Sequence, residues 1–336
     1  MHEYNWERRH NAIMKFHFHV LINQASGSGQ GKKVGDKIST LLAEKNFLHT
    51  IYYSEYAGHE REIARSLAET TLLPWNEETK ETTDAFPLLM VIGGDGTLHQ
   101  VINEFYRLNY DLPVSYIPGG SGNDFARGIG LSRKPEQAFW QIVKAAAPQN
   151  INTIVYDEKI QQETGIALNN VGIGLDAAIV ATTNESTAKK QLNKYNLGSL
   201  SYISSILKLL FTQKGFPILV ELNGTEYFFK KAFLCTTTNH PYFGGGVAIA
   251  PMAQAEKRSL DLVVVERIPM YKLFWLIIKL ARKKHTTSKH FHHFTSSRLR
   301  IVSTIPQYGQ ADGEVLQPQS FDITYTTRNQ LIWYQK

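Results

Sequence analysis

One run of the sequence, Leu88-Leu89-Met90-Val91-Ile92-Gly93-Gly94-Asp95-Gly96-Thr97, limits the possible folds more than any other. Its five leading apolar residues do not alternate with polar ones, which indicates a strand buried on both faces, as in a parallel sheet. The glycines remove side chains where the strand ends and permit a tight turn. Apolar residues then recur at helical spacing, at Leu98, Val101, Ile102 and Phe105. We expect a strand, a glycine turn and a helix whose start is a capping box of Thr97 and Gln100.

The predicted turn has the properties of a phosphate site. Free N–H groups and the dipole at a helix start both favour an anion. Asp95 adds a carboxylate, and a negative charge beside phosphate requires a cation between the two. The simplest interpretation is nucleotide phosphate with Mg²⁺. The alternative is an ordinary β–α turn in which the glycines serve only the backbone geometry.

Similar units lie on both sides of this run. Strands are expected at residues 16–22, 51–54 and 114–117. One helix is expected to follow the loop at 23–33 and end near residue 45, a second to span 59–69, and a polar surface loop to span 73–86. Alternating strands and helices predict a doubly wound α/β domain over residues 14–148, preceded by an extension at 1–13. The loop at residues 23–33 differs from a phosphate-binding Walker A loop because Lys33 stands where Ser or Thr is required.

After Pro148 short β-rich runs dominate the sequence, at residues 151–156, 165–171, 217–222, 225–238, 260–266 and 298–303. Asn223-Gly224 lies between two of these runs and is a strong hairpin signal. We expect a second, mainly antiparallel domain over residues 149–318, with helical insertions at 197–212 and 270–284. The single cysteine, Cys235, excludes an intrachain disulfide.

Several motifs in the same order resemble one known family. They are Asn23-x-x-Ser26-Gly27, the Gly-Gly-Asp-Gly-Thr-Leu run at 93–98, the Pro118–Arg127 loop with Asn-Asp-Phe-Ala-Arg, Gly-x-Asp-Ala at 174–177, and Asp-Gly-Glu at 312–314. The chain resembles the diacylglycerol kinase catalytic-domain family and, through the second motif, its NAD kinase relatives. The resemblance implies a first domain like those of NAD kinase and phosphofructokinase, to which residues 319–336 return.

The resemblance also implies an activity, that of a phosphotransferase with an alcohol acceptor. The expected enzyme is a Mg²⁺-dependent lipid kinase that moves the γ-phosphoryl group of ATP to the hydroxyl of diacylglycerol or a related lipid, in the cleft between the domains. We expect a cytoplasmic protein of phospholipid metabolism, associated peripherally with anionic membranes, without nucleic acid, and compatible with a homodimer.

Site residues follow from the same resemblance. Glu314 is the expected general base toward the acceptor hydroxyl, and Asp95 and Asp124 are the expected partners of Mg²⁺, through water. The expected ATP contacts are Asn23, Gln24, Ala25, Ser26, Gly27, Ser54, Gly93, Gly94, Asp95, Gly96, Thr97, Leu98, His99 and Ser121. From the residues alone, Asp124 also fits a helix N-cap, and Asp312-Gly313 an exposed turn.

Two other functions remain alternatives. An NAD kinase would share Gly-Gly-Asp-Gly-Thr, but the Asn-Asp-Phe-Ala-Arg loop and Asp-Gly-Glu favour the lipid kinase. A regulatory protein could keep the fold without turnover, although Asp95, Asp124 and Glu314 are intact. Relatives carry Asp-Asp-Gly where this chain has Glu256-Lys257-Arg258, and in some bacterial members that turn helps to hold a structural Mg²⁺. Two basic residues would repel a cation, so we expect none there.

The segment Met270–Lys284 combines an apolar run containing Trp275 with three basic residues at its end. This pattern is typical of a helix at a membrane interface, and it fits equally a core helix with a solvated basic end. The histidines that follow match no zinc spacing. Gly172-x-Gly174-x-x-Ala177 superficially matches a dinucleotide fingerprint, but its β-rich surroundings argue against NAD binding there. No apolar run approaches the roughly 20 residues that span a bilayer.

Overall fold

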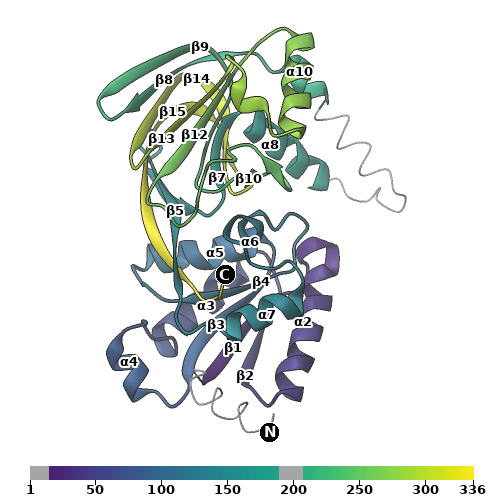
Figure 1. The fold of residues 1–336 in the computed structure, drawn as a ribbon, viewed down its shortest axis with the longest axis vertical. Helices are drawn as coiled ribbons and strands as arrows, with labels where there is room; N and C mark the ends of the chain where they lie inside the picture. Colours follow the sequence, from purple (N-terminus) through teal and green to yellow (C-terminus); the bar gives the residue numbers. More distant parts are fainter. Residues whose placement is uncertain (1–14, 189–206) are drawn as a thin grey trace, which may run out of the picture. The chain divides into compact units, whose positions relative to one another are not determined.

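The computed structural model describes residues 15–188 and 207–336, which form two units (Figure 1). The sheet of the first unit has four parallel strands, and the end of a fifth, β15 (Glu314–Ile332), pairs parallel at its edge through Ile332 and Val114. The first unit comprises residues up to Ile151, with Gly244–Gly246 and Asn329–Lys336. The second comprises Asn152–Phe243 and Val247–Arg328. The extension expected at 1–13 and most of the insertion expected at 197–212 lie outside the described residues, while residues 207–212 are helical.

The first unit has the doubly wound α/β fold that the sequence predicts. Its elements are β1 (Phe16–Asn23), α2 (Ser26–Glu44), β2 (Leu48–Ser54), α3 (His59–Thr70), α4 (Glu77–Thr82), β3 (Phe86–Gly93), α5 (Asp95–Arg107), β4 (Val114–Pro118), α6 (Asp124–Ile129) and α7 (Pro135–Val143). The strand order is β4-β3-β1-β2. Helices α2 and α7 contact one another and the sheet, as do α3 and α5. The chain order therefore reverses between β1 and β3, where open α/β sheets bind their ligands.

The central strand is buried along its whole length, as its unbroken apolar run predicts. Its helix begins earlier than expected. Helix α5 starts at Asp95, and Gly94 is the N-cap, with no side-chain hydrogen bond. The capping box predicted from Thr97 and Gln100 is wrong, because Thr97 already lies inside the helix. Its hydroxyl instead accepts a hydrogen bond of 3.0 Å from the Asn23 side-chain amide.

The segment expected as a surface loop at 73–86 contains a short helix, α4, and its last residue belongs to β3. Asn76 caps the helix by accepting from the N–H of Thr79, and the Thr79 hydroxyl caps the Asn76 N–H in return. Glu77 and Glu78 stand in the first turn, where negative charge is favourable. These local signals produce a helix in a stretch whose composition predicts only a loop.

The second unit is mainly antiparallel, as expected. Its elements are β5 (Gln149–Glu158, beginning in the first unit), β6 (Glu163–Ala167), β7 (Asn170–Gly174), α8 (Leu175–Ala188), β8 (Phe216–Leu222), β9 (Thr225–Thr238), β10 (Tyr242–Phe243), β11 (Val247–Ala248), β12 (Leu260–Glu266), α10 (Met270–Ala281), η1 (His285–Thr287), β13 (Phe291–Ser296), β14 (Leu299–Ala311) and β15 (Glu314–Ile332). The Asn223-Gly224 hairpin is confirmed: both residues have positive φ, and Leu222 pairs with Thr225.

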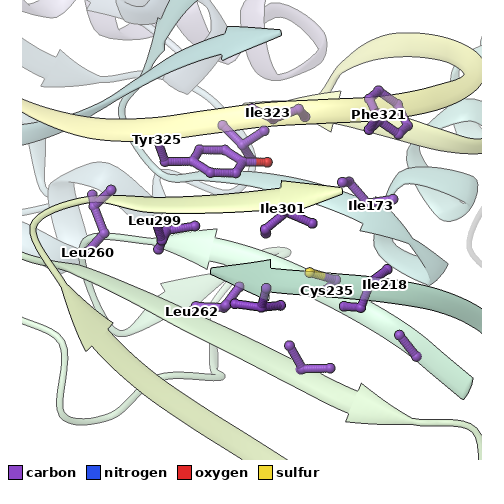
Figure 2. Packing of buried hydrophobic residues seen from close by; sticks show 14 of the residues in the cluster. Ile173, Ile218, Cys235, Leu260, Leu262, Leu299, Ile301, Phe321, Ile323 and Tyr325 are labelled. Atoms are coloured by element: carbon purple, nitrogen blue, oxygen red, sulfur yellow. The ribbon is translucent and has the colours of Figure 1, made fainter. Parts of the chain in front are cut away.

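Two long strands organise this unit. Both β9 and β14 pair with β8 near one end and with β7 near the other. Their inward side chains form a core with β12 and β15, in which Ile173, Cys235, Leu262 and Ile301 lie together (Figure 2). A second apolar cluster joins the other face of the strands to α8 and α10. Within residues 15–188 and 207–336, no helix combines the length and apolar character needed to cross a bilayer.

Candidate active site

Three turns meet at the carboxyl ends of neighbouring strands in the first unit. They follow β1, β3 and β4, whose ends are in register through the pairs Ile22–Ile92 and Gly93–Pro118. The Gly119 N–H donates to the Gly93 carbonyl at 2.6 Å, and the Ser26 hydroxyl lies 3.2 Å from the Gly119 carbonyl. The glycine motifs that the sequence places far apart therefore form one cluster.

Two glycines of this cluster are required by the packing of the turns. A Cβ atom at Gly120 would lie 2.5 Å from the Cα of Gly94. A Cβ atom at Gly27 would lie 2.7 Å from the Gly119 carbonyl oxygen, and Gly27 has a φ of +57°. At both positions, glycine lets one turn approach another.

Gly96 is different. It is exposed in the first turn of α5, where its φ is not positive. Among the described residues, no atom beyond its own helix and its chain neighbours lies within 4 Å of where its Cβ would be. Glycine in a helix costs about 0.5–1 kcal/mol relative to alanine. Neither the backbone nor the packing of the chain accounts for that cost at this position.

Asp95 lies half-buried between the turns. Its Oδ2 atom accepts a hydrogen bond of 2.8 Å from the N–H of Asp124. The Tyr116 hydroxyl lies 3.4 Å from Asp95 Oδ1 and 3.1 Å from the Gly93 carbonyl. Burial, and then the charge of Asp95, raise the pKa of Tyr116 well above its usual value. Tyr116 therefore remains a neutral hydrogen-bond donor beside the carboxylate.

Asp124 has partners of its own. Its Oδ1 atom is paired with Arg127, and its Oδ2 atom accepts a hydrogen bond of 2.7 Å from Gly245 N–H in the same unit. Helix α6 begins at Asp124, so the N-cap position falls to Asn123, and the N-cap reading of Asp124 is wrong. Asn123 adopts positive φ and bonds back to Gly120 through both amide atoms.

Asn23 joins the first turn to two helices. Its Oδ1 atom accepts from the N–H groups of Ala25 and Ser26, both at 3.1 Å. Its Nδ2 atom donates to Thr97 at 3.0 Å and to the buried Glu60 at 2.7 Å. Asn23, Ser26 and Thr97 are therefore internal members of the cluster, held by one another.

The other expected ATP contacts divide by exposure. Ala25 and Ser121 are exposed, and Gln24 is half-buried, beside the glycines. Ser54 pairs with Asn23 at the end of β2 and so lies at the same edge. The side chains of Leu98 and His99 are buried in the unit. The structure thus brings all the expected site residues of the first unit to one edge of the sheet. The side chains of Leu98 and His99, however, lie in the interior of the unit.

Glu314 belongs to the second unit, where it is exposed at the start of β15. The preceding turn is firmly held. The Asp312 carboxylate accepts from the N–H groups of Leu168, Asn169 and Asn170, at 2.6, 2.8 and 3.1 Å. Gln310 Oε1, which is buried, accepts from Gly313 N–H at 2.9 Å. Asp312 and Gln310 therefore fix the backbone that presents the Glu314 side chain.

The same Gln310 reaches a buried acid. Its Nε2 atom lies 3.3 Å from Asp176 Oδ2, and burial raises the pKa of Asp176 to about 7. The Oδ1 atom of Asp176 is buried without a hydrogen-bond partner within the described residues. Asp176 lines a cavity of about 150 Å³. The other walls are nearly all apolar and include Leu175, Ile179, Phe233, Leu273, Leu276 and Phe291.

Sequence reasoning missed Glu60, Tyr116, Gly245 and Gln310. Tyr116 carries a usable signal, because its hydroxyl lies in a buried strand two residues before the Pro118 turn. The other three act through contacts that no local pattern indicates. Among the described residues, no group of three His, Cys, Asp or Glu side chains is arranged to hold a metal.

Two family models match the chain. The model of the diacylglycerol kinase catalytic domain matches residues 17–153, and the model of the YegS C-terminal NAD kinase beta sandwich-like domain matches residues 169–327. The first match ends within β5, and the second begins just before β7.

Similar proteins are found over nearly the full length of the chain. "Putative lipid kinase YtlR" of Bacillus subtilis is 27% identical over 312 residues, which cover 91% of this chain and 96% of the relative. "Putative lipid kinase" of Staphylococcus carnosus is 28% identical over 92% of this chain and 95% of its own. The crystal structure of a "putative diacylglycerol kinase" from Bacillus anthracis shares the fold, with a TM-score of 0.70 at 20% identity over 96% of this chain and 98% of its own.

Proposed function

The chain belongs to the diacylglycerol kinase catalytic-domain family of lipid kinases and is a phosphotransferase, and on that premise we propose its substrates and the roles of its residues. We propose that it transfers the γ-phosphoryl group of ATP to a hydroxyl of diacylglycerol or a related lipid. In this reaction the lipid oxygen forms a bond to the γ-phosphorus, the bond from that phosphorus to the β,γ-bridging oxygen breaks, and ADP leaves.

Gly96 is the observation that carries the phosphate site. Its neighbours need no glycine there, yet a side chain would occupy the exposed space at the N-terminus of α5. That end presents N–H groups and the positive end of the helix dipole. A bound phosphate group would explain both features. Backbone N–H groups at close range stabilise it, and a Cβ atom at position 96 would block that close approach. Ala25, Gly27 and Ser121 lie around the same edge and complete the proposed ATP contacts.

The residues present also fit Mg²⁺. Asp95 is the carboxylate we assign to the metal, through water, since it lies half-buried where three turns meet. When bound, Mg²⁺ neutralises charge on the transferred phosphoryl group. Both oxygens of Asp124 are engaged by Arg127 and Gly245. We therefore assign Asp124 a supporting role, in which its N–H fixes the orientation of Asp95.

Glu314 is the proposed general base that takes the proton of the acceptor hydroxyl. Its exposure suits this role, because a base needs access to substrate. The turn before it is held by Asp312 and Gln310, so little freedom of the backbone is lost when substrate binds. Phosphoryl transfer asks little more of a protein than alignment, charge neutralisation and such a base.

The apolar cavity of the second unit is the proposed site for part of the lipid. Its volume of about 150 Å³ matches an engineered apolar cavity that stays dry and binds benzene. It therefore holds a segment of an acyl chain and not the whole chain. Diacylglycerol remains in the bilayer, so we also infer that this enzyme works peripherally at a membrane surface.

A coupled assay of ADP release tests the proposal. We expect a short-chain, water-soluble diacylglycerol to stimulate ADP formation in the presence of Mg²⁺, and we expect the Asp95→Asn variant to lose this stimulation. An exposed acid elsewhere in the unit, changed as Asp84→Asn, is the matched control. Equal ADP release with and without every lipid acceptor would reject the proposed reaction.

A further inference from the structure

Helix α10 is mostly apolar, with Lys272 and Lys279 as its only charged residues, yet only Leu273 and Leu276 in it are buried. It lies at the edge of the second unit (Figure 1). Its inner face is buried at Leu273 and Leu276, which line the cavity together with Ile277 and Leu280. Its outer face is exposed at Tyr271, Phe274, Trp275 and Ile278, and Trp275 is 63% exposed. The two interpretations that the sequence leaves open, a core helix and an interfacial helix, each describe one face of α10.

The exposed apolar surface continues onto a neighbouring segment. Leu207 and Phe211, in helical residues 207–212, are also exposed. The rings of Phe211 and Phe274 have centroids 6.4 Å apart. The Arg267 guanidinium donates to the carbonyls of Leu210 and Phe211, at 3.0 and 3.3 Å. This ion ties the segment to the start of α10, so the surface is one fixed patch.

Positive charge lies beside the patch, along α10 and directly after its C-terminus. The exposed cations are Lys272, Lys279, Arg282, Lys283 and Lys284. Residues 267–293 contain no Asp or Glu. Exposed aromatic and aliphatic side chains beside such cations fit the headgroup region of an anionic bilayer, where Trp and Tyr rings are favourable and each basic residue gains further attraction. A soluble apolar partner would satisfy the rings but not this charge.

We propose that the outer face of α10, with Phe211, docks on an anionic lipid bilayer, and that an acyl chain passes along this helix into the cavity under its inner face. The docking stands on the exposed patch and its charge alone. The route of the acyl chain rests on the proposed function, because it requires the cavity to take the lipid substrate. One helix would thus join the membrane to the lipid site without exposing the chain to water.

A cysteine label tests the docking directly. The only native cysteine, Cys235, is buried, so a thiol introduced by Ile278→Cys is the one accessible site for an environment-sensitive dye. We expect dye emission to rise with vesicles that contain phosphatidylglycerol, to rise much less with pure phosphatidylcholine, and to fall with salt. Phe228→Cys is the matched control, because Phe228 is 62% exposed on β9. A dye that responds at Phe228 and not at Ile278 would place the docking surface elsewhere.

The cations are tested by sedimentation with the same vesicles, without ATP. Removing three of them, as Arg282→Gln/Lys283→Gln/Lys284→Gln, should weaken binding by up to about a hundredfold. The control Arg133→Gln/Lys134→Gln/Lys144→Gln removes equal charge from exposed sites of the first unit and should leave binding unchanged. Equal loss in both variants would show attraction by net charge alone. Dye emission that rises with protein concentration in the absence of lipid would show contact between copies of the chain. Either result would overturn the docking.

Activity separates this inference from the proposed function. With Trp275→Ser, turnover of a long-chain lipid in vesicles should fall at least about tenfold, while turnover of a short-chain soluble acceptor should match the parent. If the parent shows no turnover on either acceptor, the proposed function and the acyl route fail, and the vesicle measurements still decide the docking. If the variant loses both acceptors equally, Trp275 does not act through the membrane, and the proposed route is wrong.

Discussion

The backbone N–H of Asp124 donates a 2.8 Å hydrogen bond to Oδ2 of Asp95. The two residues begin separate helices, α6 and α5, at the ends of neighbouring strands. Because the bond comes from the backbone, it orients the Asp95 carboxylate without adding charge. It leaves the Asp124 carboxylate to its own partners, Arg127 and Gly245. Two acids that look equivalent in sequence therefore have different surroundings, and we expect their substitutions to differ.

Replacing Asp95 by Asn should reduce turnover by about a hundredfold or more, the scale for losing a key electrostatic group. The Asn oxygen can still accept from the Asp124 N–H, so the free energy of unfolding should change little. Steady-state kinetics at saturating Mg²⁺ and urea unfolding measure the two effects. Near-normal turnover in a folded variant would remove Asp95 from the proposed mechanism.

Gly96→Ala and Gly120→Ala should have opposite signatures. Alanine at position 96 meets no clash. The free energy of unfolding should therefore equal that of the parent or exceed it by about 0.5–1 kcal/mol. The new Cβ atom should nevertheless lower kcat/KM for ATP about a hundredfold by displacing the phosphates. Alanine at 120 would collide with Gly94 and should lower the free energy of unfolding by about 1–3 kcal/mol. Full activity of Gly96→Ala would mean that no phosphate approaches that position.

Substitutions at Glu314 and at Asp312 should separate an effect on turnover from an effect on stability. Glu314→Gln changes an exposed side chain and should leave unfolding within about 0.5 kcal/mol of the parent, with turnover lowered about 10²–10⁴-fold. Asp312→Asn replaces one acceptor oxygen by a donor against backbone N–H groups and should cost about 1–3 kcal/mol. Kinetics and thermal unfolding of both variants provide the test. The proposed base would be wrong if Glu314→Gln kept its activity.

Asp176 should make stability depend on pH. Its pKa is raised from 3.8 to about 7 by burial, so the folded state keeps a proton that the unfolded state loses. Its contribution to stability is therefore fully present below pH 3.8 and is lost as the pH rises to about 7. Asp176→Asn removes this dependence. As the pH rises through that window, the free energy of unfolding of the variant should therefore increase relative to that of the parent, by about 1.4 kcal/mol per pH unit. Urea unfolding at pH 5 and pH 8 measures the difference, and a constant difference would contradict the raised pKa.

Most of the fold could be predicted from local patterns. The unbroken apolar run at β3 predicts a fully buried strand, and Asn223-Gly224 predicts its hairpin, because each signal depends on a few adjacent residues. The exact start of α5 could not be predicted in this way. The helix begins after Gly94, before Thr97 and Gln100, the pair that indicated a capping box. In α4, the capping by Asn76 outweighs a composition typical of loops.

The candidate site was predictable in its residue types and not in its connections. The motifs identify Asp95, Asp124 and Asp312, yet only the structure gives their partners Tyr116, Gly245 and Leu168. These partners come from distant parts of the chain, and no spacing rule relates them. The Asp176–Gln310 contact is of the same kind, because it joins residues 134 positions apart.

Transfer of label from γ-labelled ATP tests the proposed reaction most directly. The parent, Asp95→Asn and Glu314→Gln are each incubated with Mg²⁺, a panel of hydroxyl-bearing lipids and NAD, and the products are separated by solvent extraction and chromatography. We predict label in a phosphorylated lipid with the parent alone, and none in NADP. Label in NADP, or no transfer to any lipid on the panel by a folded parent, would contradict the assignment as a diacylglycerol-type lipid kinase.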